Sequence, residues 1–121
     1  MKETPKVHEG EYRFCLILWE NEPIASSKLA ELCKEQLGWS RTTTYTIIRR
    51  LSDRGVVKSE NTIVTSLVSK EEVQLSEMNE LVEKTFEGSL PAFIAAFTQN
   101  SRLTSEEAEA IRRMIDQAEE K

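Results

Sequence analysis

The sequence predicts a mainly α-helical protein with one small β-hairpin. Apolar residues recur at helical spacing in three segments before residue 55 and in three segments after residue 69. Between these two groups, apolar and polar residues alternate as they do in β-strands. Serine, threonine, glycine and proline mark the starts and ends of the expected helices. This order of elements predicts a winged helix-turn-helix domain followed by a C-terminal three-helix module.

The segment from Ser40 to Gly55 predicts a short helix with a divided surface. Ser40 is a favoured N-cap residue, and Gly55 can end the helix in a left-handed conformation. At about 100° per residue, the inward stripe consists of Thr44, Ile47, Ile48 and Leu51. The outward side consists of Arg41, Thr42, Tyr45, Thr46, Arg49 and Arg50. Hydroxyls, an aromatic ring and arginines suit a groove lined by phosphates and base edges. We therefore expect a DNA-recognition helix at about residues 41–54, with the residues from Ser40 through Arg50 docked in the major groove.

Two further helices are expected before this one. The first covers about residues 9–20, and its expected inward residues are Tyr12, Cys15, Leu16, Leu18 and Trp19. The second opens at Ser26 or Ser27, and only Gly38 and Trp39 separate it from the third, which is the helix-turn-helix arrangement. We expect free amides at the start of the second helix, around Ser26, Ser27 and Lys28, to meet DNA phosphate.

Residues 56–59 and 62–68 read as two β segments around the short polar turn Glu60-Asn61. A two-stranded hairpin packed on a helix-turn-helix is a wing, which commonly lies along the DNA backbone or in the minor groove. This hairpin is only weakly basic, with Lys58 and the polar tip Asn61 and Thr62. We therefore expect the wing to position the protein on DNA and not to read bases.

The C-terminal part is expected to hold three helices. Ser69 and Glu72 fit a capping box that opens the first of them, and Thr104 and Glu107 fit another that opens the last. Between them, Ser89-Leu90-Pro91 restarts the chain with proline at a tolerated early helical position. The sequence thus predicts a DNA-binding domain at residues 1–70 and a helical domain at 71–121.

This helical domain is too small to offset its ordering entropy by burying its own apolar surface. A second copy of the chain can supply the missing half of the core, so we expect a homodimer. The alternative is that the helices fold back on their own N-terminal domain. The apolar residues assigned to the dimer interface are Met78, Leu81, Val82, Phe86, Leu90, Phe93, Ile94, Phe97, Ile111 and Ile115.

The net charge of −5 averages two unlike halves. Through Lys70 the chain has eleven Lys and Arg against nine Asp and Glu, whereas from Glu71 it has five against twelve. The basic residues therefore concentrate in the half where DNA would lie, and the acidic half should face away from it.

Several function classes are disfavoured. His8 is the only histidine, and no nucleophile and base are paired by a catalytic spacing, so we expect neither an enzyme nor a metal or other cofactor site. No apolar run approaches the roughly twenty residues of a membrane span, and no targeting signal is apparent, which predicts a cytoplasmic protein. Cys15 and Cys33 fit small buried hydrophobes; a redox pair or metal site is the alternative.

The chain resembles the penicillinase-repressor family (BlaI/MecI-type) over nearly its whole length. The features that carry the resemblance are, in order, Leu18-Trp19 with Pro23, Trp39-Ser40, Thr43 and Thr46, Arg50-Leu51 with Gly55, Glu87-Gly88-Ser89-Leu90, Phe97, and Leu103-Thr104-Ser105-Glu106-Glu107. The resemblance implies a dimeric winged-helix repressor that occupies palindromic double-stranded DNA operators. The DNA-facing positions that it implies are Arg41, Thr42, Thr43, Tyr45, Thr46, Arg49 and Arg50.

The chain also departs from this family. Family members often carry lysine or arginine where this chain has Thr42 and Tyr45, so its operator should differ. In resistance repressors an inducing protease cleaves between asparagine and phenylalanine, but Ala96 precedes Phe97 here, which leaves a protease partner unsupported. The cysteine cluster of a copper-sensing branch is also missing. A rival function is a winged-helix protein-interaction module without sequence-specific DNA binding, which a weak salt dependence of duplex affinity would reveal.

Overall fold

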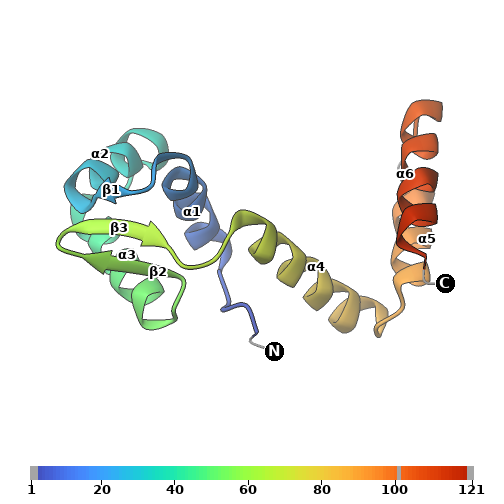
Figure 1. Ribbon diagram of the computed structural model, residues 1–121, viewed down its shortest axis with the longest axis horizontal. Coiled ribbons are helices and arrows are strands. Elements are labelled where there is room, and N and C mark those ends of the chain that lie inside the picture. Colours follow the sequence, from blue (N-terminus) through green and yellow to red (C-terminus); the bar gives the residue numbers. More distant parts are fainter. Residues whose placement is uncertain (1–2, 101, 120–121) are drawn as a thin grey trace. The chain divides into compact units, whose positions relative to one another are not determined.

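The computed structural model describes residues 3–100 and 102–119. Within these residues the chain forms six helices and three short strands (Figure 1). In chain order they are α1 (Glu9–Asn21), β1 (Ile24–Ala25), α2 (Ser26–Leu37), α3 (Arg41–Asp53), β2 (Val57–Glu60), β3 (Ile63–Ser66), α4 (Lys70–Phe86), α5 (Leu90–Asn100) and α6 (Ser105–Ala118). The predicted fold class, a winged helix with a helical C-terminal module, is confirmed.

The chain divides into two compact units, Met1–Met78 and Asn79–Lys121. The division falls inside α4, so the first two turns of that helix belong to the first unit. The domain limit between residues 70 and 71 stays a prediction.

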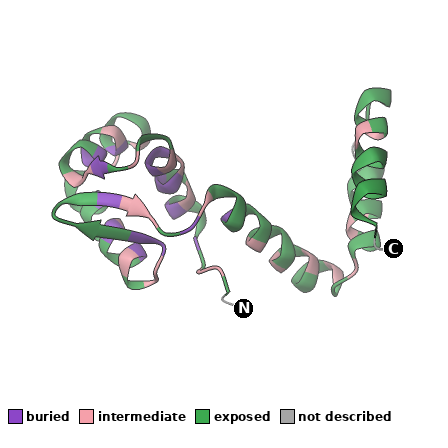
Figure 2. Ribbon diagram, viewed as in Figure 1, coloured by how far each residue is buried: buried purple, intermediate pink, exposed green. Residues whose placement is uncertain are grey.

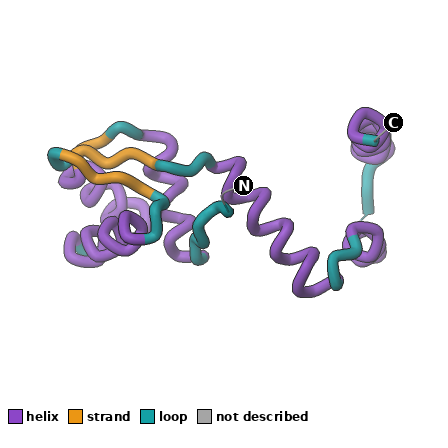
Figure 3. Tube along the Cα trace, turned by 60° about the horizontal axis from the view of Figure 1, so that its bottom comes forward, coloured by secondary structure: helices purple, strands orange, loops and turns teal. Residues whose placement is uncertain are grey.

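The first unit is built around a continuous apolar core. α1 packs on α2 and β3, while α3 packs on α2 and β2, so the three strands lie together over the helices (Figure 3). Phe14, Leu18, Leu29 and Leu51 are the largest side chains that are fully buried there. Burying one such side chain stabilises the folded chain by about 1.5–3 kcal/mol relative to leaving it exposed to water. This core fixes the position of α3.

The buried face of α1 differs from the predicted one. Phe14 and Ile17 are buried together with the predicted Cys15 and Leu18, whereas Tyr12, Leu16 and Trp19 are half-buried. The reason is that α1 carries two neighbouring apolar stripes, and both find partners in the first unit. A single-stripe interpretation of the sequence could not show which of them faces the centre.

The sheet has three strands, one more than the predicted hairpin. Its order is β1-β3-β2, and all neighbours are antiparallel. β1 has only two residues, too few to produce an alternating pattern. The hairpin turn also lies one residue later than expected, at Asn61 and Thr62, whose φ angles of 53° and 65° are those of a tight turn between twisted strands. The Thr62 carbonyl accepts a hydrogen bond from the Ser26 amide at 2.8 Å, which holds this turn against the start of α2.

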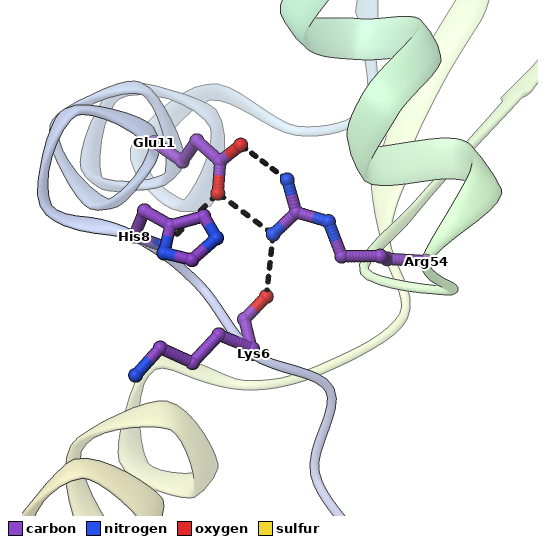
Figure 4. A network of polar contacts seen from close by, with 4 residues as sticks. All are labelled: Lys6, His8, Glu11 and Arg54. Carbon is purple, nitrogen blue, oxygen red and sulfur yellow. Dashed lines mark hydrogen bonds and ion pairs between the residues drawn. The ribbon is translucent and has the colours of Figure 1, made fainter.

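An ion pair around the buried carboxylate of Glu11 ties the N-terminal segment and α1 to the end of α3 (Figure 4). Arg54, the C-cap residue of α3, donates from both terminal nitrogens to the carboxylate of Glu11, and also to the Lys6 carbonyl at 2.9 Å. The His8 amide donates to the same carboxylate at 2.9 Å. Burial alone would raise the pKa of Glu11, but these hydrogen bonds outweigh it and hold that pKa below its ordinary value.

The second unit has a different character. Its helix starts are well capped: the Ser89 hydroxyl accepts from the Ala92 amide at 3.1 Å, and Thr104 and Glu107 form the predicted capping box. However, none of the residues 79–99 and 102–119, whose burial the structure describes, is buried (Figure 2). An edge-to-face contact of Phe86 and Phe93, with ring centroids 5.6 Å apart, joins α4 to α5. This unit therefore encloses no core of its own.

Replacement of Arg54 by alanine should destabilise the first unit. The Glu11 side chain is only 7% exposed, so its carboxylate would remain buried without its cationic partner. We expect Arg54→Ala to lower the free energy of unfolding by about 2 kcal/mol at pH 7, measured by urea denaturation. The control is Arg50→Ala, an exposed arginine of the same helix, which should change it by less than about 0.5 kcal/mol. Equal losses in both variants would contradict a structural role for the ion pair.

The stabilisation by Glu11 should depend on pH. Because the pKa of Glu11 is lower in the folded chain than its ordinary value of 4.5, the ionised group stabilises the fold above pH 4.5. This contribution is lost as the pH falls through the folded-state pKa. The difference in unfolding free energy between the native chain and Glu11→Gln should thus be largest near neutral pH and shrink in acid. A difference that grows below pH 4.5 would have the wrong sign.

Candidate nucleic-acid interface

The ends of α3 are fixed by its own sequence. The Ser40 hydroxyl accepts from the Thr43 amide at 3.1 Å, which confirms the predicted N-cap. The two hydroxyls of Ser40 and Thr43 also share a hydrogen bond of 2.9 Å. After the helix, Gly55 adopts a φ of 82°, a left-handed conformation that glycine takes without steric cost. The hydroxyl of Thr43 is therefore part of the cap as well as of the helix surface.

The two faces of α3 match the predicted division. Thr44, Ile48 and Leu51 are buried and Ile47 is half-buried. The outward residues are all exposed: Arg41, Thr42, Thr43, Tyr45, Thr46, Arg49 and Arg50. We call these seven residues the α3 surface. They form one solvent-facing strip of hydroxyl, phenol and guanidinium groups on a helix whose other side is held in the core.

The charge of the α3 surface is not neutralised locally. Arg41, Arg49 and Arg50 form no ion pair with any residue in the described part of the chain. Asp53 is the one acidic residue of α3. The guanidinium groups are thus free to donate to an external anion, and their planar donors match phosphate oxygens or the edge of guanine.

The start of α2 is only partly as predicted. Ser26 is half-buried, and its amide is not free because it donates to the Thr62 carbonyl. The expectation of a free amide at Ser26 is wrong, because antiparallel pairing of β1 with β3 continues into this residue. Ser27 and Lys28 are exposed, and Ala25 at the N-cap supplies no side-chain hydrogen bond. The next amides of this helix therefore remain the candidates for phosphate contact.

The wing carries little free positive charge. Lys58 lies 3.2 Å from the carboxylate of Glu60, and both side chains are largely exposed. Asn61 and Thr62 are exposed at the hairpin tip, as predicted. An exposed pair of this kind contributes little to stability but lowers the net charge that the wing offers to phosphate. This arrangement favours a positioning role for the wing.

Helices α4, α5 and α6 carry further exposed apolar side chains. Of the predicted interface residues, seven are exposed: Met78, Leu81, Leu90, Ile94, Phe97, Ile111 and Ile115. Val82, Phe86 and Phe93 are half-buried. Leu75 and Met114 were not assigned to the interface, although they are 56% and 63% exposed. The spacing of Leu75 with Met78 and Val82, three and seven residues along α4, is the signal that would have identified it.

The two cysteines lie inside the first unit. Cys15 and Cys33 are both free and buried, as predicted, and burial raises the pKa of the Cys15 thiol to about 12. In the described ranges no group of three His, Cys, Asp or Glu residues could hold a metal ion. Across those same ranges, each helix is too short or too polar to cross a membrane.

The chain is similar to known proteins over nearly its whole length. The family model of the penicillinase repressor matches residues 9–117. The chain is 24% identical over 118 residues to the methicillin resistance regulatory protein MecI of Staphylococcus aureus. The aligned region covers 94% of this chain and 96% of that protein. It is 23% identical, with the same coverage, to the MecI proteins of Mammaliicoccus sciuri and Staphylococcus epidermidis. The chain therefore belongs to the penicillinase repressor family, a family of DNA-binding transcriptional repressors.

Proposed function

We propose that the protein is a homodimeric, sequence-specific repressor that binds palindromic operators through α3. The observation that carries this proposal is the α3 surface, whose arginines are exposed and unpaired within the described chain while the opposite side of the helix is buried. An α-helix fits the major groove of B-DNA, where each base pair offers a distinct pattern of donors and acceptors.

Each part of the α3 surface has a chemical role in this proposal. Arg49 donates to base edges, and Arg41 and Arg50 donate to phosphate on either side. The hydroxyls of Thr42 and Thr46 can donate or accept, and their methyl groups can contact thymine. Tyr45, which is 36% exposed, packs its ring on a thymine methyl group or a sugar. Thr43 contributes less to readout because its hydroxyl already bonds to Ser40.

Contacts outside α3 hold the domain in register. The open amides at Ser27 and Lys28 meet phosphate at the start of α2, where the helix dipole favours an anion. The wing adds contacts from Lys58, Asn61 and Thr62. Because Lys58 already forms an ion pair with Glu60, these contacts are mainly neutral hydrogen bonds. Such contacts orient a protein on the duplex without reading sequence.

The exposed apolar side chains of the second unit support dimerisation. Its described side chains are all at least partly exposed, including Leu90, Ile94 and Phe97 on α5 and Ile111 and Ile115 on α6. Exposed apolar side chains in this number favour an interaction site, and a second copy provides a matching set. Two copies related by a two-fold axis present two α3 surfaces to a two-fold symmetric DNA site.

The first test combines operator selection with substitution of Arg49. Native protein should select one palindrome from a random duplex pool. Arg49→Ala should then relax base preference at one position of each half-site by about 1–3 kcal/mol, measured by fluorescence anisotropy with single-base variants. Arg49→Lys should relax the same preference but retain the salt dependence of native binding, because it keeps the charge without the bidentate donor pair.

Arg13→Ala is the control for this test, since Arg13 is an exposed arginine of α1 outside the α3 surface. It should leave the base preference unchanged. Unchanged preference in Arg49→Ala would contradict the proposed recognition surface. Native protein that binds all duplexes weakly, with little dependence on salt, would instead indicate a protein-interaction module.

The second test addresses dimerisation. Phe97→Glu places a charge within the proposed interface, so it should weaken self-association by about 2 kcal/mol or more, measured by sedimentation equilibrium. Gln99→Glu adds the same charge to an exposed position of the same helix and should change self-association little. Native protein with the mass of one 13.9 kDa chain at micromolar concentration would refute the dimer and favour helices folded back on the first unit.

A further inference from the structure

We propose that the start of α4 is held by a specific joint in the first unit, and that this joint sets the operator half-site spacing that the dimer accepts. The joint consists of Tyr12, Trp19, Val68, Val73 and Gln74. This inference rests on the proposed function. It adds a positioning role for residues that lie outside the α3 surface.

The contacts of the joint link residues far apart in the sequence. The Trp19 indole donates from Nε1 to the Val68 carbonyl at 3.0 Å, just before α4 begins. Trp19 also packs edge-on against Tyr12, with ring centroids 5.8 Å apart. Tyr12 in turn accepts a hydrogen bond from Gln74 Nε2 at 3.3 Å. These contacts attach α1 both to the segment before α4 and to its second turn.

Val73 completes the joint from the inside. It is 2% exposed and belongs to the core of the first unit, and it is the one buried residue in the described part of α4. Leu75 and Met78 follow at about 200° and 140° around the helix from Val73, so they lie on the opposite side. They are 56% and 40% exposed. The first turns of α4 therefore have one face locked into the first unit and another free for a partner.

Because α4 has one locked face and one free face, the joint can affect how the dimer binds DNA. If a partner copy covers the free face, the angle at which α4 is locked fixes where each α3 surface lies relative to the two-fold axis. Moving the half-sites apart by two base pairs shifts one of them by about 7 Å and rotates it by about 70°. A locked α4 cannot follow such a change without breaking the joint, whereas a loosened one can. The joint thus makes the dimer selective for one spacing.

Two variants loosen the joint in different ways. Trp19→Phe keeps an aromatic ring but removes the Nε1 donor to Val68. Val73→Ala removes two methyl groups from the buried contact. The control is Val64→Ala, which makes the same truncation at a fully buried position of β3. All three variants should bind an isolated half-site with similar affinity.

The experiment measures affinity for the selected palindrome and for versions with two base pairs added or removed between the half-sites. Native protein and Val64→Ala should discriminate between spacings by at least about tenfold. Trp19→Phe and Val73→Ala should reduce this ratio to within about threefold, mainly by gaining affinity for the altered sites. An unchanged ratio in both joint variants would overturn the inference.

A second measurement does not depend on DNA. Amide hydrogen exchange of residues 73–78 should be faster in Trp19→Phe and Val73→Ala than in native protein, but not in Val64→Ala. Unchanged exchange in both joint variants would show that these contacts do not hold α4. If exchange responds as expected but native protein selects no palindrome, the proposed function fails while the joint itself stands.

Discussion

Burial of apolar surface is completed in the first unit and left unfinished in the second, and this difference governs the rest of the account. In the first unit, residues from α1, α2, α3, the sheet and the start of α4 close one core. In the second unit, the described helices are well capped and regular, yet the side chains of residues 79–99 and 102–119 all remain at least partly open to solvent. Helices of this length are marginal in water without tertiary packing. Packing of their apolar residues against a partner would stabilise them, and the partner proposed above is a second copy of the chain.

The same division explains how an acidic chain can bind DNA. The arginines of the first unit serve two purposes that the sequence alone does not separate. Arg54 forms an ion pair with the buried carboxylate of Glu11 and stabilises the end of α3. Arg41, Arg49 and Arg50 remain unpaired among the described residues and exposed on the same helix. One structural ion pair thus holds the helix whose other cations face solvent.

Local signals in the sequence predicted most of the fold. Capping by Ser40 and Thr104 and the left-handed Gly55 are decided by neighbouring residues, so the helix boundaries could be assigned without tertiary information. Helical periodicity likewise separated the inner and outer faces of α3, because only one of its sides is apolar.

The features that the sequence did not predict depend on distant residues. β1 is too short for a pattern and exists through pairing of Ile24 and Ala25 with β3. Glu11 looks like an ordinary helix-start acid, and its burial depends on Arg54, 43 residues away. The position of the hairpin turn is likewise tied to α2 through Ser26. These are non-local contacts, which neither propensity nor periodicity encodes.

The central claim is that two copies of the α3 surface read neighbouring turns of one duplex. Hydroxyl-radical footprinting of native protein on its selected palindrome tests this most directly. The account predicts two protected segments on one side of the duplex, related by two-fold symmetry, with centres about 10 base pairs apart or a multiple of that distance. A single protected segment, or uniform weak protection along the duplex, would contradict it.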